Sequence, residues 1–341
     1  MIKKRIAGRT GLAISELCLG TLNFGWKTDE TTAFAILDAY YAAGGNFVQS
    51  TSRSPDLMFP SASSNVSEEI VGRWWKSRGI PRHDLLLTTR IHVSQVAGSE
   101  NNFIKVVRQA VHDSLRRLQT DYIDMVIFEW NDGLLPIRYT LQAFDQVVRN
   151  EWARFIGAAN FPAWRTVDAL GRAYLRNHCR MEAIQADYSL MTRARFEPEA
   201  MALCQEQRLA FFARSPLAGG FFARSREIES PFGSARRDTL LAKFGKSYAE
   251  TALTAAADVA ARHEASSAQV ALAWVLQNPV VTSAIIGVRS AKQLSELVHG
   301  TRLALTATDL EQLGDATVAE EVRVMPETQR RRFALGEAVL N

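Results

Sequence analysis

Several polar and charged side chains lie where short apolar runs of this chain end. Glu129 closes the apolar run 123–128, Arg90 and Arg214 close two other runs, and His92 lies just beyond the first arginine. A carboxylate near arginines can transfer protons, and the arginines can bind an anion or polarise a carbonyl group. Glu129 is therefore the first candidate for a catalytic residue.

Amides and further polar groups lie at equivalent positions. Gln49, Gln185 and Asn160 lie at or near the ends of three more runs, Ser215 follows Arg214, and Arg289 follows one further run. If these ends converge, two arginines, one carboxylate and the amides form a pocket of net positive charge that suits an anionic substrate. Structural interpretations remain open, with the glutamines as hydrogen-bonded interior groups, a glutamate–arginine ion pair across neighbouring strands, and the histidine as a loop residue.

Alternating apolar and helical patterns supply the elements that would position these residues. The expected strands cover residues 14–21, 46–50, 85–90, 122–129, 153–158, 182–187, 209–214 and 283–287. The expected helices cover residues 29–43, 102–118, 136–150, 162–176, 198–207, 248–263, 267–277 and 291–299, with another starting at Ser67. Eight strand-then-helix units predict an α/β fold, a closed (β/α)8 TIM barrel. In such a barrel the carboxyl ends of the strands meet at one mouth, where the chemistry takes place.

The segments outside these units predict a single domain over residues 1–341. Glycines in residues 2–12 indicate a small N-terminal β-hairpin, and residues 300–341 form a C-terminal extension. The polar segment 51–65 follows the second strand, so it is expected either to lie over the mouth as a lid or to be disordered.

The composition narrows the classes of partner. The chain has 341 residues and a formal net charge of +4, with a pI near 9.0. Its basic residues are spread along the chain, which argues against nucleic acid as a partner. The three cysteines lack metal-binding spacing, so no metal is expected. No signal peptide and no membrane-spanning run is recognised, which favours a cytoplasmic monomer or homo-oligomer that binds a small molecule.

Longer stretches of the chain resemble the aldo-keto reductase family, in particular the subgroup similar to potassium-channel β-subunits and to bacterial sugar or pyridoxal dehydrogenases. The resemblance covers about residues 3–318. The segments that carry it are GRTGLAISELCLGTLNFG (8–25), GGNFVQST (44–51), SEEIVGRWWKSRG (67–79), SLRRLQTDYIDMVIF (114–128), FIGAANFPAW (155–164), IQADYSL (184–190), RSPLAGG (214–220) and IIGVRSAKQL (285–294). It implies an NADP(H)-binding barrel without a Rossmann motif.

The resemblance also implies a catalytic tetrad of Asp, Tyr, Lys and His, and all four positions differ here. The matching residues are Gln49, Ser54, Arg90 and Glu129. Reduction of a carbonyl needs a proton donor at the developing alkoxide, and serine, arginine and glutamine do not supply one near neutral pH. Ordinary carbonyl reduction is therefore not expected.

The cofactor positions that the resemblance implies are partly kept. The matching residues are Asn160 and Gln185 for the nicotinamide carboxamide, Ser215 and Leu217 for the pyrophosphate, and Arg289, Ser290 and Gln293 for the adenosine end. The aromatic residue that the family places under the nicotinamide ring is Arg214 here. NADP(H) binding is therefore expected at the adenosine end, whereas Arg214 opposes it at the nicotinamide end.

Three functional hypotheses follow from these residues. The first is a repurposed non-redox acid–base enzyme of the lyase, isomerase or cyclase type. Its acid or base would be Glu129, with Arg90 and Arg214 binding an anionic metabolite and Gln49 orienting it. The second is an NADP(H)-dependent oxidoreductase on an imine-type substrate, with Glu129 or His92 handling protons. The third is a non-catalytic sensor or partner subunit that binds NADP(H) or a metabolite.

Overall fold

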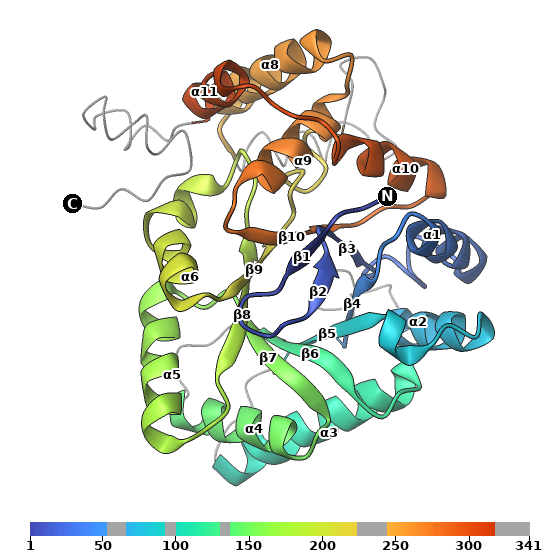
Figure 1. Ribbon diagram of the computed structural model, residues 1–341, viewed down its shortest axis with the longest axis vertical. Helices are drawn as coiled ribbons and strands as arrows, with labels where there is room; N and C mark the ends of the chain where they lie inside the picture. The colour runs from blue at the N-terminus through green and yellow to red at the C-terminus, as the bar shows by residue number, and fades with distance from the viewer. Residues whose placement is uncertain (53–65, 93–99, 130–136, 224–243, 318–341) are drawn as a thin grey trace.

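The computed structural model describes residues 1–52, 66–92, 100–129, 137–223 and 244–317. In these ranges, eight parallel strands form a closed barrel, and helices surround it (Figure 1). The prediction of a (β/α)8 barrel is confirmed. The barrel strands are β3 (Leu17–Gly20), β4 (Phe47–Thr51), β5 (Leu86–His92), β6 (Ile123–Glu129), β7 (Ala153–Ala159), β8 (Met181–Asp187), β9 (Ala210–Arg214) and β10 (Val281–Ile286).

The helices lie within a few residues of their expected positions, except α11, which was not predicted and lies in the C-terminal extension. They are α1 (Glu30–Ala42), α2 (Val66–Ser77), α3 (Glu100–Leu118), α4 (Ile137–Arg149), α5 (Ala163–Arg176), α6 (Ala202–Gln207), α8 (Lys246–Arg262), α9 (Ser267–Gln277), α10 (Ala291–Gly300) and α11 (Ala307–Ala316). The expected helix 198–207 is divided, because the turn Glu197–Met201 is a π-helix and α6 begins only after it.

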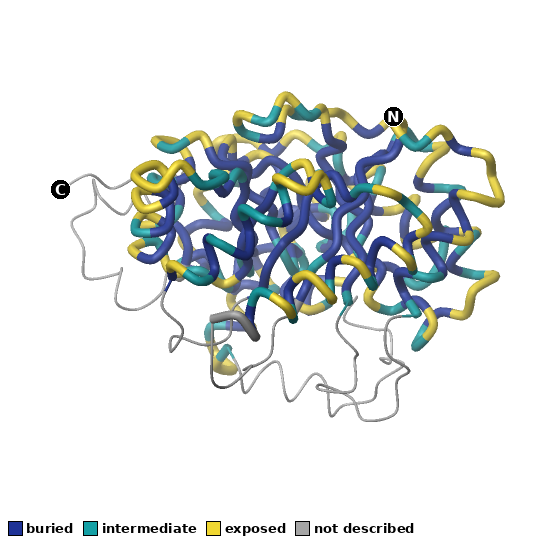
Figure 2. Tube along the Cα trace, turned by 90° about the horizontal axis from the view of Figure 1, so that it is seen from below, coloured by how far each residue is buried: buried dark blue, intermediate teal, exposed yellow. Residues whose placement is uncertain are grey.

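The barrel wall is the centre of the core. All seven residues of β6 are buried, as expected for a strand that packs against helices outside and against other strands' side chains inside. Figure 2 shows the same distribution along the chain, with buried residues in the central strands and exposed residues mostly on the periphery. The rigid wall therefore fixes where each strand ends, and with it the position of the polar side chains.

The N-terminal hairpin is present, but its bounds differ from the prediction. Strand β1 (Lys4–Ile6) pairs antiparallel with β2 (Ala13–Ser15), so the hairpin extends past residue 12. The expected first strand 14–21 is therefore two strands, divided at Glu16. The Glu16 side chain is buried and bonded to Arg5 Nη2 at 3.0 Å, which holds the chain where it passes from the hairpin into the barrel.

The hairpin covers the amino-terminal end of the barrel. Arg5 donates to the carbonyl oxygens of Val281, where β10 begins, and of Leu276, near the end of α9, both at 2.7 Å. Asn46, just before β4, donates to the carbonyl oxygen of Ala13 at 3.0 Å. The open end of the barrel is therefore the carboxyl-terminal end, where the candidate residues lie.

A buried aspartate holds α11 against α8 and gives a testable pH dependence. Asp309 Oδ1 accepts a hydrogen bond from Arg262 at 2.6 Å, and Oδ2 accepts one from the Thr306 hydroxyl at 2.7 Å and lies 2.7 Å from His263 Nε2. Burial acts to raise the pKa of Asp309, but the bonds from Arg262, His263 and Thr306 outweigh it and hold the pKa well below its ordinary value.

We expect Asp309→Asn to lower the free energy of unfolding by about 2 kcal/mol at pH 7, because the ionised form makes these bonds. A carboxylate with a lowered folded-state pKa stabilises the fold above its unfolded pKa, and this stabilisation is lost as the pH falls. The deficit of the variant should therefore shrink below about pH 4. Urea unfolding at pH 6 and pH 3.5 measures it, with the exposed Asp315→Asn as a control on the same helix. A deficit that does not depend on pH would contradict the ionic origin.

Candidate active site

Glu129 lies at the last position of β6, between two strands that also carry candidate residues. The register places Glu129 opposite His92 of β5 on one side and opposite Ala159 of β7 on the other. Asn160 follows directly after Ala159. Because neighbouring parallel strands end at the same edge, this register brings the end of three strands into contact with one carboxylate.

Two arginines face the Glu129 carboxylate. Arg90 Nε is 3.4 Å from Oε2, and Arg214 Nη1 is 3.6 Å from Oε1. The Glu129 side chain is 6% exposed, while those of Arg90 and Arg214 are 12% and 22% exposed. The structural interpretation of Arg90 and Glu129 as an ion pair across neighbouring strands is therefore confirmed, with Arg214 as a third member.

Arg214 is also held by groups from β8 and from the segment after β7. Its Nε donates to Asp187 Oδ1 at 2.7 Å, and its Nη2 donates to Asn160 Oδ1 at 3.0 Å. The same Asn160 side chain donates from Nδ2 to Glu129 Oε1 at 3.2 Å. One asparagine therefore joins the carboxylate of β6 to the guanidinium of β9.

Asp187 is the site residue that the sequence analysis missed. It closes β8 as Glu129 closes β6, so its position at the end of an expected strand could have identified it. With Asp187 included, the four charged side chains named here are two arginines and two carboxylates. The expectation of a net positive pocket is therefore wrong for these side chains, because Asp187 balances the second arginine.

Gln49 and Gln185 meet inside the barrel mouth. Gln185 Nε2 donates to Gln49 Oε1 at 2.8 Å, and both side chains are buried. Gln185 Oε1 and Gln49 Nε2 are buried, and neither has a hydrogen-bond partner among the residues that the structure describes. An unused acceptor and an unused donor are the complement of a carboxamide, so this pair fits the amide of a nicotinamide ring.

The five residues expected at the phosphate and adenosine end lie after two adjacent strands. Ser215 and Leu217 follow β9, and β9 pairs with β10, which precedes α10. Ser290 caps α10 by accepting from the Gln293 amide at 3.2 Å, and Gln293 Oε1 accepts from the Arg289 amide at 2.9 Å. These bonds fix a helix N-terminus at the mouth, an arrangement suited to a phosphate group.

Left-handed backbone occurs in the loops that follow β7 and β9. Asn160 has φ 63°, Ser215 has φ 54° and Ala218 has φ 52°. Residues with a Cβ atom adopt this conformation only at a cost, which is lowest for asparagine. The strained positions coincide with two of the expected cofactor residues, as is typical of ligand-binding loops.

Two expected residues lie partly or wholly outside the described residues. Ser54 and most of the proposed lid 51–65 fall in the range 53–65, and only the backbone of His92, in β5, is described. Their expected roles therefore stay predictions. No group of three His, Cys, Asp or Glu that could hold a metal is found among the described side chains. No helix in the described ranges is long and apolar enough to cross a membrane.

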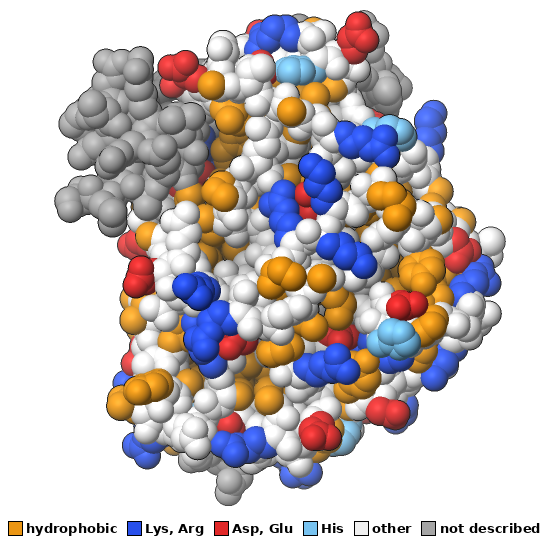
Figure 3. Space-filling model, in the orientation of Figure 1, with side chains coloured by type: hydrophobic (Ala, Val, Ile, Leu, Met, Phe, Trp, Pro, Cys, Tyr) orange, Lys and Arg blue, Asp and Glu red, His pale blue; other side chains and the backbone are white. Residues whose placement is uncertain are grey.

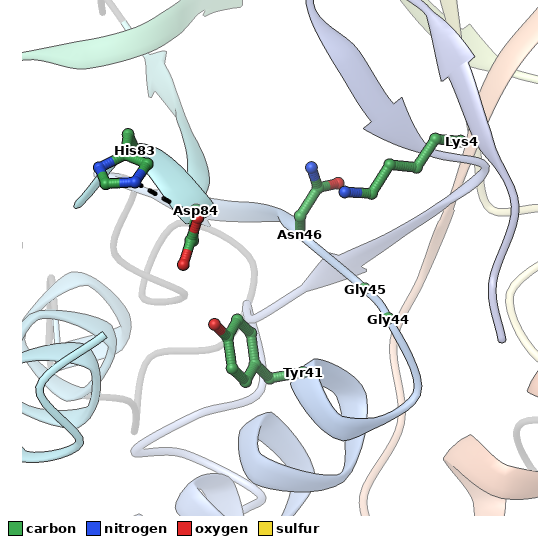
Figure 4. Close-up of a pocket in the computed structure, with 7 residues that line it drawn as sticks. All are labelled: Lys4, Tyr41, Gly44, Gly45, Asn46, His83 and Asp84. Carbon is green, nitrogen blue, oxygen red and sulfur yellow. Dashed lines mark ion pairs between the residues drawn. The ribbon is translucent and has the colours of Figure 1, made fainter. Parts of the chain in front are cut away.

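A recess of about 280 Å³ lies at the opposite, amino-terminal end of the barrel. Lys4, Tyr41, Asn46, His83 and Asp84 are among the residues that line it (Figure 4). The Asn46 amide is already used to bond the hairpin, and the imidazole and carboxylate that face each other are 3.6 Å apart. Figure 3 shows this face with acidic and basic side chains interspersed. The recess is therefore a seam between the hairpin and the barrel, distinct from the mouth.

Comparison with known proteins agrees with this architecture. The family model described as "Aldo/keto reductase family" matches residues 16–317. The chain belongs to the aldo/keto reductase family.

Three relatives show the level of similarity within the family. The "Uncharacterized oxidoreductase YrpG" of Bacillus subtilis is 33% identical over 316 residues, which cover 90% of this chain and 94% of the relative. "Protein tas" of Escherichia coli is 29% identical, with 87% and 92% covered. "Norsolorinic acid reductase stcV" of Emericella nidulans is 29% identical, with 89% and 79% covered.

The names of these relatives bear on the three functional hypotheses. Two of the three name an oxidoreductase or a reductase. They point to oxidoreduction, which was the second hypothesis, and they give no support to a non-redox lyase, which was the first. The family as a whole generally uses a nicotinamide cofactor.

Proposed function

We propose that this protein is an NADP(H)-dependent oxidoreductase that acts on a small imine carrying an acidic group. Its membership of the aldo/keto reductase family and the oxidoreductase names of its relatives support the redox part of the proposal. The cluster of Arg90, Glu129, Asp187 and Arg214 supports the choice of substrate.

The choice of an imine as substrate is supported mainly by the contacts that the Glu129 carboxylate makes. One oxygen faces Asn160 and Arg214, and the other faces Arg90. A substrate would have to compete with these groups for the carboxylate before it could exchange a proton there. Proton transfer by Glu129, on which the non-redox hypothesis depends, is therefore disfavoured. A reaction that needs no proton from the protein is favoured.

Reduction of a protonated imine meets this condition. The C=N⁺ carbon accepts the hydride, the C=N π electrons become the nitrogen lone pair, and the product is an amine. The nitrogen already carries its proton, so no general acid is needed at the moment of transfer. When bound, NADPH would supply the hydride and leave as NADP⁺.

The balanced charge of the cluster suits a zwitterionic substrate. An iminium group would be stabilised beside Glu129 or Asp187, and an acidic group would be bound by Arg90 or Arg214. The buried Gln185 Oε1 and Gln49 Nε2 would accept from and donate to the cofactor carboxamide, which fixes the ring next to the cluster. The helix N-terminus at Ser290 would face a cofactor phosphate.

Binding of NADPH is the first test. We expect saturable binding to the purified protein, measured by the change in NADPH fluorescence. Gln185→Leu should weaken it about tenfold or more, because it removes the unused buried acceptor. The exposed Gln109→Leu serves as the matched control. Stopped-flow absorbance at 340 nm with cyclic imino acids then tests hydride transfer. Absence of NADPH binding contradicts the proposal and the sensor hypothesis together, whereas binding without oxidation by any imine favours the sensor.

Arg214 gives a second prediction about the nicotinamide end. We expect Arg214→Tyr to raise the affinity for NADP⁺ roughly tenfold, because an aromatic face attracts the cationic ring that a guanidinium repels. The gain should be smaller for NADPH, whose nicotinamide ring is neutral. Isothermal titration with both forms measures the difference, with the exposed Arg302→Tyr as a control. Equal gains for both forms would show that ring charge is not the cause.

A further inference from the structure

Exposed apolar side chains are concentrated on helix α5. Among the described residues, eight large apolar side chains are exposed, and four of them lie in the 14 residues of this helix. They are Trp164 at 65%, Val167 at 53%, Tyr174 at 88% and Leu175 at 79%. Single exposed apolar residues are ordinary, but a contiguous patch marks an interaction surface. Figure 1 shows α5 on the outer rim of the barrel, between α4 and α6.

The four side chains share one face of the helix. At roughly 100° per residue, Trp164, Gly171 and Leu175 follow one line along the helix, and Val167 and Tyr174 lie on one flank of that line. Gly171 is exposed, and an added Cβ would meet nothing within 4 Å. The centre of the face therefore allows a second backbone to approach closely, with an aromatic anchor toward each end.

The opposite flank of the line carries one acid and one base. Asp168 and Arg172 form an ion pair of 2.6 Å within the helix, and their side chains are 35% and 54% exposed. Suppose that a second copy of α5 packs antiparallel to the first, about a two-fold axis near residue 170. The charged flank of one copy then lies against the charged flank of the other, with the two chains running in opposite directions. Asp168 then faces the second copy's Arg172, and Arg172 faces the second copy's Asp168. The charged flank is therefore complementary to itself.

The apolar residues are self-complementary about the same axis. Val167 meets Tyr174 of the second copy, and Trp164 meets its Leu175, so apolar groups cover apolar groups at both ends. We propose that α5 is the contact of a symmetric homodimer, in which two copies of this helix pack antiparallel. Such an interface is isologous and closes on itself without further growth.

The size of the patch predicts a reversible dimer. Aromatic side chains contribute roughly 150–250 Å² each when buried. With the valine, the leucine and the charged flank, the contact amounts to about 600 Å² per protomer. Stable interfaces bury about 800 Å² per partner, so a dissociation constant of roughly 1–100 µM is expected.

Sedimentation velocity of the full-length protein over a concentration series is the direct test. Leu175→Lys should raise the dissociation constant about tenfold or more, because it buries a charge against Trp164 of the second copy. Ile6→Lys is the matched control, since Ile6 is 58% exposed but lies on the hairpin, away from α5. This control should leave the dissociation constant within about twofold.

Variants that exchange the charges of Asp168 and Arg172 distinguish this interface from a dimer formed through another surface. Asp168→Arg alone opposes arginine to arginine in the dimer, and Arg172→Asp alone opposes aspartate to aspartate, so each variant should be mostly monomeric. Mixed together, the two variants restore both pairs, and a heterodimer should form with nearly the wild-type constant. Circular dichroism checks that both variants keep the fold. A monomeric wild type at about 100 µM, a dimer that Leu175→Lys does not weaken, or a mixture that stays monomeric would each overturn the proposal.

Discussion

We expect Glu129→Leu to lower the free energy of unfolding by about 3–5 kcal/mol, because it removes the carboxylate shared by two guanidinium groups of which only a small part is exposed. The side chains of Arg90 and Arg214 are only 12% and 22% exposed, so water cannot replace the lost partner fully. Arg214 keeps Asp187, whereas Arg90 loses the carboxylate that lies 3.4 Å from its Nε. Urea unfolding followed by circular dichroism measures the change.

Two further variants separate charge burial from a general effect of substitution. Glu69→Leu removes a carboxylate that is 45% exposed and 3.7 Å from Arg73, and it should cost less than about 1 kcal/mol. Arg90→Met added to Glu129→Leu should recover part of the loss, because the guanidinium that Glu129 faces is then gone as well. A loss below about 1 kcal/mol for Glu129→Leu would contradict the prediction, because it would mean that water at the barrel mouth solvates both guanidinium groups.

A second buried pair should show an effect of similar size. Arg193 and Glu197 form an ion pair of 2.8 Å, with side chains that are 0% and 4% exposed. Tyr188 donates to the second oxygen of Glu197 at 2.8 Å and accepts from Asn278 at 2.7 Å. We expect Arg193→Met to lower the free energy of unfolding by about 3–5 kcal/mol, since it leaves a carboxylate in the core.

The pH dependence of this loss follows from Glu197. Burial raises the pKa of Glu197, while Arg193 and Tyr188 act in the opposite direction. Without the arginine the pKa should rise further, so the folded variant holds a proton that the unfolded chain releases. A raised carboxyl pKa makes stability fall as the pH rises, and the deficit should therefore be larger at pH 8 than at pH 5.

Two control variants test whether the unpaired charge of Glu197 causes the loss in Arg193→Met. One removes an exposed arginine with the same spacing to its acid, and the other also removes the charge of Glu197. Arg149 also pairs with an acid four residues away, but its side chain is 61% exposed, so Arg149→Met should cost less than about 1 kcal/mol. Glu197→Gln added to Arg193→Met should recover stability, because it keeps an acceptor for Tyr188 and removes the charge. If it recovers nothing, packing against Trp274, whose ring centre is 5.0 Å from the guanidinium carbon, is the main contribution of Arg193.

The barrel was predictable because its signals are local. The strand-then-helix pattern recurs eight times, and a strand such as 122–129 needs no distant information to be recognised. The division at Glu16 was not predictable in this way. Residues 14–21 form one continuous pattern, and only the bonds of Arg5 to Glu16 and to the start of β10 show that the chain changes sheets there.

The site was predictable as a set of positions but not as a set of partners. The ends of the strands identified Glu129, Arg90 and Arg214 because parallel strands end at one edge. The same rule applied to 182–187 gives Asp187, which was overlooked. No pattern in the sequence shows that Asn160 bonds both Glu129 and Arg214, since that depends on side-chain torsions and on the left-handed backbone at φ 63°.

The closure of the barrel has a consequence for how this protein is made. Strand β3 pairs with β10, and Arg5 bonds a carbonyl 276 residues away. During synthesis on the ribosome, β3 and Arg5 of the hairpin therefore cannot pair with β10 until almost the whole chain has emerged. Until then the sheet has two open edges, which can pair with other nascent chains. Cellular yield should therefore depend on the interval between the synthesis of β9 and that of β10, more than on the stability of the finished barrel.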